Sequence, residues 1–305
     1  MAGGSLVDLL IDTWQAQVDD GFLLSDPYAA DIEVRTEADP VSGVPFRLRW
    51  LPHREIRFDV DELERRGILN PDRAGAALFG DPRDPSGRHC FLCTANIKVV
   101  HPMEVLVPIE LAGRDYVAGA NFAWIGLNHY TVMAAEHIDQ DFTPHVLDAM
   151  LDLHRSTGGT FRVLYNGAQA GATIPWHLHL QITTDRFPVE DLPAGAEPEY
   201  PAVVHRFPGD GPGNEAALEH AERWIALDPD HHRVNLLVAG PGDAPVIHVF
   251  LRDSRLTHAP EKGLMGGFEI CGDLVYSEPD KRTQFETATA ETVRRVIAAV
   301  KPDLA

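Results

Sequence analysis

Polar and apolar side chains alternate along the segment from Trp176 to Thr183, which reads Trp-His-Leu-His-Leu-Gln-Ile-Thr. Successive side chains of a β-strand point to opposite faces, so a strand here has one apolar face and one polar face. The polar face carries His177, His179 and Gln181. Such groups are costly to bury unless they hold a metal, a ligand or each other. The alternative is a polar strand that simply faces solvent.

Small residues fill the segment just before this strand, from Asn166 to Thr173. Their short side chains leave room for an anion to reach backbone N–H groups. Imidazole is a competent nucleophile toward phosphorus near neutral pH, and a phosphoimidazole can pass its group to an acceptor. The amide of Gln181 can hydrogen-bond a non-bridging phosphate oxygen without adding charge. The two segments together predict phosphate chemistry, with His179 as the nucleophile.

Two of the three cysteines, Cys90 and Cys93, have the spacing of a zinc knuckle. An odd count with one close pair does not indicate the disulfide framework of a secreted protein. In a reducing compartment the pair is typical of a metal site or a redox pair, and two ordinary buried cysteines are the other alternative. A tetrahedral metal site needs two further ligands from elsewhere. Cys271 is expected to be a buried apolar residue.

The segment from Asn166 to Gln181 resembles the active-site motif of the histidine-triad superfamily. The match is to the transferase branch, in which glutamine replaces the third histidine. That branch includes galactose-1-phosphate uridylyltransferase, diadenosine tetraphosphate phosphorylases and GDP-hexose phosphorylases. The runs 171–174 and 187–190 are most similar to the GDP-hexose phosphorylase group. The resemblance implies that His179 carries a nucleoside monophosphate and that Gln181 stabilises this intermediate.

The same resemblance implies the other ligands of a metal. In the uridylyltransferase-like enzymes zinc, where present, is held by a Cys-x-x-Cys pair, a histidine after the following strand and the first histidine of the motif. Those positions correspond to Cys90, Cys93, His137 and His177. A zinc ion with four protein ligands is structural, and this one would orient His179 through His177. His89 could replace His137, although an adjacent residue on the same turn is a strained choice.

A substrate that carries phosphates needs local positive charge, because the chain has a formal net charge of −20. Arginine binds phosphate oxygens in pairs, which makes Arg54 and Arg252 candidates; a plain surface arginine is the alternative for each. The resemblance implies a base or ribose contact at Asn121. The substrate-binding residues we expect are Asn166, Gly171, Thr173, Arg54, Asn121 and Arg252. Glu269 and Asp273 could touch sugar hydroxyls, but their surroundings favour a solvated turn.

Helical periodicity is clear in four segments. They are residues 5–18 with Ser5 as cap, 143–158 opened by Thr143 and Pro144, 214–225 with Asn214 as cap, and 289–300 stopped by Pro302. Strand-like runs lie at 104–108, 129–134, 161–165, 176–183, 233–238 and 246–251. Helices and strands intermix without regular alternation, which predicts an α+β fold rather than a doubly wound sheet.

A Pro- and Gly-rich stretch over residues 186–213 reads as a long connection between two lobes. We therefore expect an N-terminal catalytic lobe with the zinc site over residues 1–190, a connection over 191–213 and a C-terminal lobe over 214–305. The resemblance implies that each lobe is a histidine-triad-like half-domain, an antiparallel sheet with helices, as in the uridylyltransferases. The C-terminal lobe would have lost its catalytic histidines.

The composition excludes several other classes. With 26 basic and 46 acidic residues the chain is too acidic for a nucleic-acid backbone to be its main partner. No apolar run approaches the roughly 20 residues that span a bilayer, and the first helical segment lacks the basic leader of a signal peptide. A cytoplasmic protein is expected, with a homodimer as one option.

The predicted reaction is a two-step transfer. A nucleoside diphosphate-sugar, or another diphosphate-linked nucleotide, gives its nucleoside monophosphate to His179, and inorganic phosphate or a sugar phosphate collects it. One alternative is a dinucleoside polyphosphate phosphorylase or hydrolase of the same superfamily, and Gln181 in place of a third histidine speaks against the hydrolase. A non-catalytic nucleotide-binding protein is the other alternative, against which both His179 and Gln181 argue.

Overall fold

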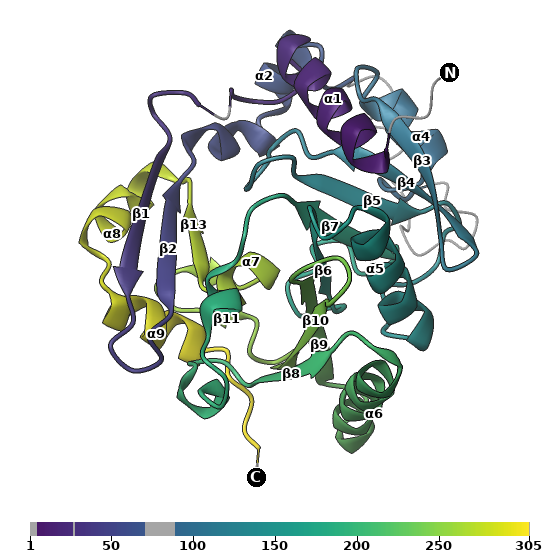
Figure 1. The fold of residues 1–305 in the computed structure, drawn as a ribbon. Coiled ribbons are helices and arrows are strands. Elements are labelled where there is room, and N and C mark those ends of the chain that lie inside the picture. Colours follow the sequence, from purple (N-terminus) through teal and green to yellow (C-terminus); the bar gives the residue numbers. More distant parts are fainter. Residues whose placement is uncertain (1–4, 27, 71–88, 305) are drawn as a thin grey trace.

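An eight-stranded antiparallel sheet in the order β3-β4-β5-β7-β6-β9-β10-β8 forms the centre of the computed structural model, which describes residues 5–26, 28–70 and 89–304 (Figure 1). Its strands are β3 (Leu106–Leu111), β4 (Arg114–Ala120), β5 (Tyr130–Ala134), β6 (Arg162–Asn166), β7 (His179–Thr183), β8 (Val204–Pro208), β9 (His232–Ala239) and β10 (Val246–Asp253). A second sheet has the order β1-β2-β13, from β1 (Glu33–Ala38), β2 (Pro45–Trp50) and β13 (Asp273–Tyr276). A short pair joins β11 (His258–Ala259) to β12 (Gly263–Leu264). The prediction of an α+β fold is confirmed.

Helices cover both faces of the large sheet. The longer ones are α1 (Leu6–Asp19), α5 (Pro144–Ser156), α6 (Gly211–Leu227) and α9 (Ala290–Ala298). The shorter ones are α2 (Val60–Arg65), α4 (Thr94–Val100), α7 (Gly267–Ile270), α8 (Arg282–Thr287) and the 3-10 helices η1 (Pro52–Phe58), η2 (Pro188–Asp191), η3 (Glu197–Glu199) and η4 (Pro279–Lys281). Among the described residues, none of these helices is long and apolar enough to cross a membrane.

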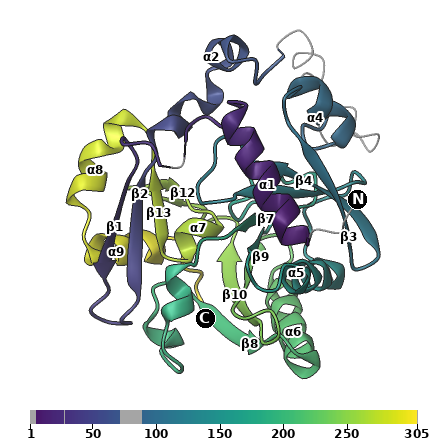
Figure 2. The same cartoon turned by 45° about the horizontal axis from the view of Figure 1, so that its top comes forward.

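The two faces of the sheet belong to two separate apolar cores. Leu178, Leu180 and Ile182 pack with α1 and α5 in one core, and Figure 2 shows α1 lying across this side of the sheet. Tyr130 of β5 fixes that helix by donating a hydrogen bond to the Leu10 carbonyl at 2.5 Å. Leu164 belongs to the other core, which also contains residues of α7, α9 and the three-stranded sheet. Three residues of the apolar face predicted for the segment 176–183 are thus buried as expected, whereas Trp176 is only partly buried and packs against a third cluster that contains Cys90 and Met133.

Helix starts follow the predicted capping chemistry with one exception. Ser5 caps α1 in a reciprocal capping box with Asp8, and α5 has Pro144 in its first turn. The prediction that Asn214 caps the third helix is wrong, because α6 already begins at Gly211. Asp210 is the cap, since its side chain accepts a hydrogen bond from the Gly213 N–H.

A buried ion network joins the two sheets. Arg49 of β2 donates hydrogen bonds to Asp273 of β13 at 2.9 Å and to Asp185, just after β7, at 2.7 Å. Arg47 contacts Asp273 at 2.6 Å. Burial raises the pKa of Asp273, but the two guanidinium groups outweigh it and hold the pKa below its usual value. The expectation of a solvated turn for Glu269 and Asp273 is wrong: they are 9% and 0% exposed.

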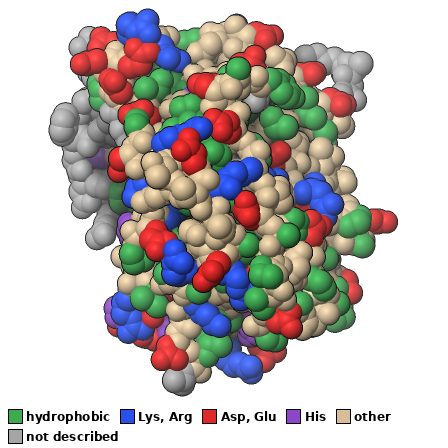
Figure 3. All heavy atoms as spheres, turned by 90° about the vertical axis from the view of Figure 1, so that its left-hand side faces the viewer, with side chains coloured by type: hydrophobic (Ala, Val, Ile, Leu, Met, Phe, Trp, Pro, Cys, Tyr) green, Lys and Arg blue, Asp and Glu red, His purple; other side chains and the backbone are tan. Residues whose placement is uncertain are grey.

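Although acidic residues outnumber basic ones, the face shown in Figure 3 is not uniformly acidic. On the side of the molecule that carries β1, β2, α8 and α9, basic and acidic side chains are interspersed (Figure 3). Arg282 of α8 pairs with Glu33 of β1 at 2.8 Å, and Arg295 of α9 pairs with Glu261, between β11 and β12, at 2.8 Å. Both are exposed pairs of the kind that stabilises a protein only slightly.

Candidate functional site

His179 lies in a row of residues that crosses the sheet. Met133 of β5 is directly opposite His179, and Thr131 is opposite Gln181. On the other side Leu164 of β6 is opposite Gln181, and Asn166, two residues further on, pairs with Asn235 of β9. Because side chains alternate along each strand, all of these point to the same face. The row joins the predicted nucleophile to the end of β6.

The imidazole of His179 is held in one orientation. It is 5% exposed, and its Nδ1 lies 2.8 Å from the carbonyl oxygen of His177. A carbonyl only accepts, so Nδ1 carries the proton and Nε2 keeps its lone pair. Burial lowers the pKa of His179 from its ordinary value, which favours the neutral ring. A neutral imidazole with a free Nε2 is the form that attacks phosphorus.

Gln140, which no feature of the sequence singled out, fixes the backbone of this strand. Its Oε1 accepts a hydrogen bond from the His179 N–H at 2.7 Å. Its Nε2 donates to the carbonyls of His179 and Asn166 at 2.9 and 2.8 Å, and Tyr165 donates to the Gln140 carbonyl at 2.7 Å. The fully buried amide thus ties the ends of β6 and β7 together and sets the position of His179.

The four predicted metal ligands meet at one point. The ligand atoms of Cys90, Cys93, His137 and His177 all lie within 4.8 Å of one another. Nδ1 of His177 lies 3.3 Å from Nδ1 of His137 and from Sγ of Cys90, and Nδ1 of His137 lies 3.4 Å from Sγ of Cys93. Tetrahedral zinc, with bonds of about 2.3 Å to sulfur and 2.0–2.1 Å to nitrogen, places neighbouring ligands about 3.3–3.8 Å apart. The residues present fit zinc.

A second contact prepares His177 as a ligand. Its Nε2 lies 2.9 Å from the Ala134 carbonyl, so Nε2 carries the proton and Nδ1 presents a lone pair to the metal. Metal-bound histidines are commonly oriented in this way by a carbonyl. The same residue supplies the carbonyl that orients His179. A metal at this cluster would therefore hold the backbone that aims the nucleophile.

Gln181 lies beside a second buried histidine, His129. Burial, together with the nearby Arg54 and Arg49, lowers the pKa of His129 to about 3. The ring therefore stays neutral at pH 7 and packs on Phe268, with 5.4 Å between the ring centroids. Gln181 and His129 add polar groups to the site without adding charge.

The loop before the strand packs tightly against the start of α7. Gly171 has a φ of 107°, and a Cβ there would lie 2.6 Å from the Gly266 Cα. Glycine is thus needed at this position for close backbone approach. Asn235 donates a hydrogen bond to the Asn166 side chain at 2.7 Å. The predicted substrate contact Thr173 is exposed.

Neither candidate arginine is a plain surface residue. Arg252 is 1% exposed and donates to the Met265 carbonyl at 3.0 Å, while its Nε and Nη1 have no partner among the described residues. Arg54 donates to the Ala123 carbonyl. Burial lowers the pKa of each to about 10, and Glu269 opposes this shift in both. The charge of Glu269 thus acts on both guanidinium groups, and Lys262 lies 3.7 Å from the same carboxylate.

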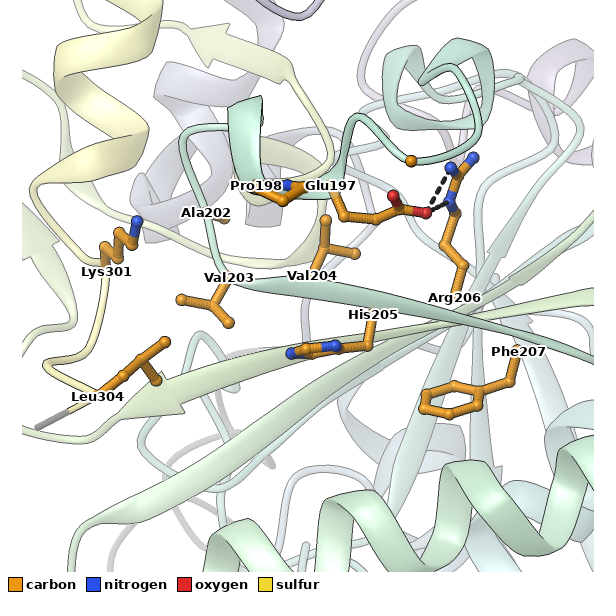
Figure 4. A pocket seen from close by; sticks show the side chains of 11 residues that line it. Glu197, Pro198, Ala202, Val203, Val204, His205, Arg206, Phe207, Lys301 and Leu304 are labelled. Carbon is orange, nitrogen blue, oxygen red and sulfur yellow. Dashed lines mark hydrogen bonds and ion pairs between the residues drawn. The ribbon is translucent and has the colours of Figure 1, made fainter.

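Asn121 lines a small cavity of about 70 Å³ beside the histidine strand. The other lining residues are Phe91, Leu92, Ile97, His101, Glu104, Gly119, Ala120, Phe122, Thr131 and Met133. A larger cavity of about 590 Å³ lies elsewhere, between η3, β8 and the C-terminal residues Lys301 and Leu304 (Figure 4). None of the predicted site residues lines it. The smaller cavity is the one adjacent to His179, because Met133 is opposite it.

Comparisons with known proteins support the fold described above. Residues 46–184 match a family described as a domain of unknown function, DUF4922. The fold is similar to yeast Ap4A phosphorylase Apa2, with a TM-score of 0.65 and 16% identity over 100% of both chains. The structures of that enzyme with AMP and with Ap4A give TM-scores of 0.65 and 0.59 at 17% and 16% identity, over 100% and 98% of each chain. The comparison with curated proteins gives no significant match. At such identities the likeness establishes the fold.

Proposed function

We propose that the protein is a nucleotidyltransferase that acts through a covalent nucleotidyl-histidine on His179. The observation that carries this proposal is the bond between His179 Nδ1 and the His177 carbonyl at 2.8 Å, because it leaves Nε2 unprotonated and directed. In the first step Nε2 forms a bond to the α-phosphorus, and the bond to the leaving oxygen breaks. In the second step an acceptor oxygen attacks and the N–P bond breaks. Two displacements give net retention at phosphorus.

The remaining side chains of the site would bind different phosphate groups of the substrate. Gln181 donates its amide to a non-bridging oxygen of the transferred group. Arg54 and Arg252 neutralise the leaving phosphate, since the guanidinium of Arg252 has two nitrogens without a partner among the described residues. The backbone around Gly171 and the Asn166 side chain line the approach to the strand. Thr173 has weaker support because it is exposed.

Zinc, when bound by Cys90, Cys93, His137 and His177, has all four positions filled and supplies structure rather than an activated water. His177 is the link, because one residue offers Nδ1 to the cluster and its carbonyl to His179. The thiols must lose their protons on binding, so metal affinity falls as the pH falls.

Dinucleoside polyphosphates are the first substrate class to test. The likeness to Ap4A phosphorylase over the full chain supports this choice. Nucleoside diphosphate-sugars are the second class, and the runs 171–174 and 187–190 support it. The acceptor is inorganic phosphate or a sugar phosphate in either case.

Covalent labelling tests the proposal directly. The protein is incubated with α-³²P-labelled dinucleoside tetraphosphates and nucleoside diphosphate-sugars without acceptor, then resolved by denaturing electrophoresis. We expect an acid-labile label that is absent in His179→Ala and present in the control His258→Ala, which changes an exposed histidine. Added phosphate should release a nucleoside diphosphate. Tight nucleotide binding without label would favour a non-catalytic binding protein, and release to water alone would favour a hydrolase.

A further inference from the structure

A buried asparagine on β9 lies in the same row of side chains as His179. Asn235 is 1% exposed and is directly opposite Asn166 of β6. Gln140 holds the carbonyl groups of Asn166 and His179 at 2.8 and 2.9 Å from its Nε2, so Asn166 lies beside His179 at the end of the β6–β7 pair. The row therefore runs from His179 through Asn166 to Asn235. Neighbouring strands lie about 4.8 Å apart, which places Asn235 roughly 10 Å from His179.

The contact between the two asparagine side chains sets the direction of the Asn166 amide. Asn235 donates a hydrogen bond from its Nδ2 to Oδ1 of Asn166 at 2.7 Å. An amide carries its acceptor and its donors on separate branches of one planar group. Because Asn235 holds the oxygen, the Nδ2 donors of Asn166 are left for another partner. Phosphate oxygens are strong acceptors, so the amide has the orientation that a phosphate beside His179 requires.

Close backbone packing leaves the Asn166 side chain little room to turn. The residue is 6% exposed. A Cβ at Gly267 would lie 2.9 Å from its Oδ1, and a Cβ at Gly171 would lie 3.4 Å from the same atom. Two glycines, one in α7 and one in the loop before β7, thus allow the backbone to enclose this oxygen.

Unpartnered polar atoms gather on the same side of the sheet. Oδ1 of Asn235 has no hydrogen-bond partner among the residues that the structure describes. Asn235 is directly opposite Phe250, so Arg252, two residues further along β10, is its diagonal neighbour on the same face. Two guanidinium nitrogens of Arg252 also lack a partner within the described part of the chain. An apolar pair of similar shape would be about as stable as the asparagine pair, so stability alone does not account for Asn235.

We propose that Asn235 is a positioning residue for nucleotidyl transfer. It holds the Asn166 amide so that Nδ2 donates to a non-bridging oxygen of the transferred phosphate. Donors that are oriented in advance stabilise the transition state without reorganisation. The inference rests on the proposed function, since it takes the phosphate to be at His179. Asn235 lies outside the matched residues 46–184, so the C-terminal part of the chain would contribute to the site without a catalytic histidine.

The rate of His179 labelling tests this role, with the same α-³²P-labelled dinucleoside tetraphosphates and nucleoside diphosphate-sugars. Asn235→Asp offers acceptors only, and would therefore turn the Asn166 Nδ2 group toward itself and away from the phosphate. We expect it to lower the rate constant at saturating nucleotide about 100-fold, as loss of one oriented donor does. Asn235→Ala, which only removes the donor, should lower it less. The control Asn214→Asp makes the same chemical change in α6 and should keep the wild-type rate.

An Asn166→Ala background separates positioning from other effects of these substitutions. In that background Asn235→Ala should change the rate constant by less than about 3-fold, because the amide through which Asn235 acts is absent. Asn235→Asp should then show only the direct effect of its charge on the substrate. Equal losses from Asn235→Ala with and without the Asn166 side chain would overturn the inference. Asn235→Ala adds no buried charge, so it keeps the test available if Asn235→Asp does not fold.

The outcomes separate the two proposals. Labelling at the full wild-type rate in folded, zinc-containing Asn235 variants overturns the role of Asn235 and leaves nucleotidyl transfer intact. If no nucleotide labels the wild type, transfer is overturned, and binding of AMP and GMP by calorimetry still reports on Asn235. In that case Asn235→Ala should weaken binding only when Asn166 is present, and unchanged binding would overturn the inference. Absence of both labelling and nucleotide binding would overturn both proposals.

Discussion

Strands β7 and β10 belong to the same sheet, and each buries a histidine. His179 is 5% exposed and His248 is 2% exposed, and burial lowers the pKa of both. They differ in how the ring is held. His179 bonds the His177 carbonyl, and its backbone is fixed by Gln140, whereas Nδ1 of His248 has no partner among the described residues. Burial is common to both strands, and under the proposed function the bonds that orient His179 and its backbone are what suit it to act as a nucleophile.

Removing the metal ligands should have the largest effect on the orientation of His179, which distinguishes β7 from β10. In Cys90→Ser with Cys93→Ser we expect loss of bound zinc, a free energy of unfolding lower by on the order of 4–5 kcal/mol, and no labelling of His179. Metal analysis and denaturant unfolding measure this. Cys271→Ala, which removes a buried cysteine outside the cluster, should retain zinc. Zinc retained by the double variant would contradict the ligand assignment.

Gln140→Leu should weaken the site while leaving the metal in place. Three buried backbone groups lose their partner, so unfolding should become easier by about 2–3 kcal/mol. A displaced nucleophile should lower kcat by about 100-fold, with KM little changed. Single-turnover labelling measures the chemical step. An unchanged labelling rate in a folded, zinc-containing variant would show that Gln140 does not position His179.

A substitution of Arg252 tests whether β10 contributes to substrate binding. Two nitrogens of its guanidinium have no partner among the described residues. Replacing a buried, incompletely paired charge with an apolar residue is often neutral or stabilising. Arg252→Met should therefore keep the free energy of unfolding within about 1 kcal/mol, or raise it, while it raises KM at least about 10-fold through loss of a charged contact. A large loss of stability with unchanged KM would assign Arg252 to structure alone.

His248→Leu should have the smallest effect, which appears only with pH. The pKa of His248 falls from 6.5 in the unfolded chain to about 4 in the folded protein. Its contribution to stability is therefore complete above pH 6.5 and is lost as the pH falls toward 4. Between about pH 7.5 and about pH 6 the wild type should lose about 1 kcal/mol more than the variant. Denaturant unfolding at both values gives this difference; equal losses would contradict it.

The residues of the candidate site could be identified from the sequence to a large extent, because the signal depends on residue types at short spacing. The alternation of His177, His179 and Gln181, the Cys90–Cys93 pair and the Asn166–Thr173 loop are all local. Their positions hold, although β7 itself begins only at His179 rather than Trp176. The chain turns before that point so that His177 can reach the cysteines.

Long-range partners could not be predicted in the same way. Gln140 acts on a backbone 39 residues away, and Glu104 lies over a glycine from another strand; neither pairing leaves a periodic signal. The sequence patterns also missed β1, β2, β4, β13, the short strands β11 and β12, and β8, which lies within the stretch predicted as a connection. The order of these strands depends on parallel and antiparallel pairing between separate segments. Short strands of this kind gain their stability from burial in the assembled fold.

The ion network between the sheets limits how the chain can be divided. Residues 46–184 match a family taken as a unit, yet this segment contains Arg47 and Arg49 without the buried carboxylate of Asp273. A fragment cut at those limits would carry two clustered cations whose main counter-charge lies about ninety residues beyond its end. The sheet that contains β7 would also lose β9. The matched segment thus leaves out a carboxylate and a strand with which its own buried residues pair.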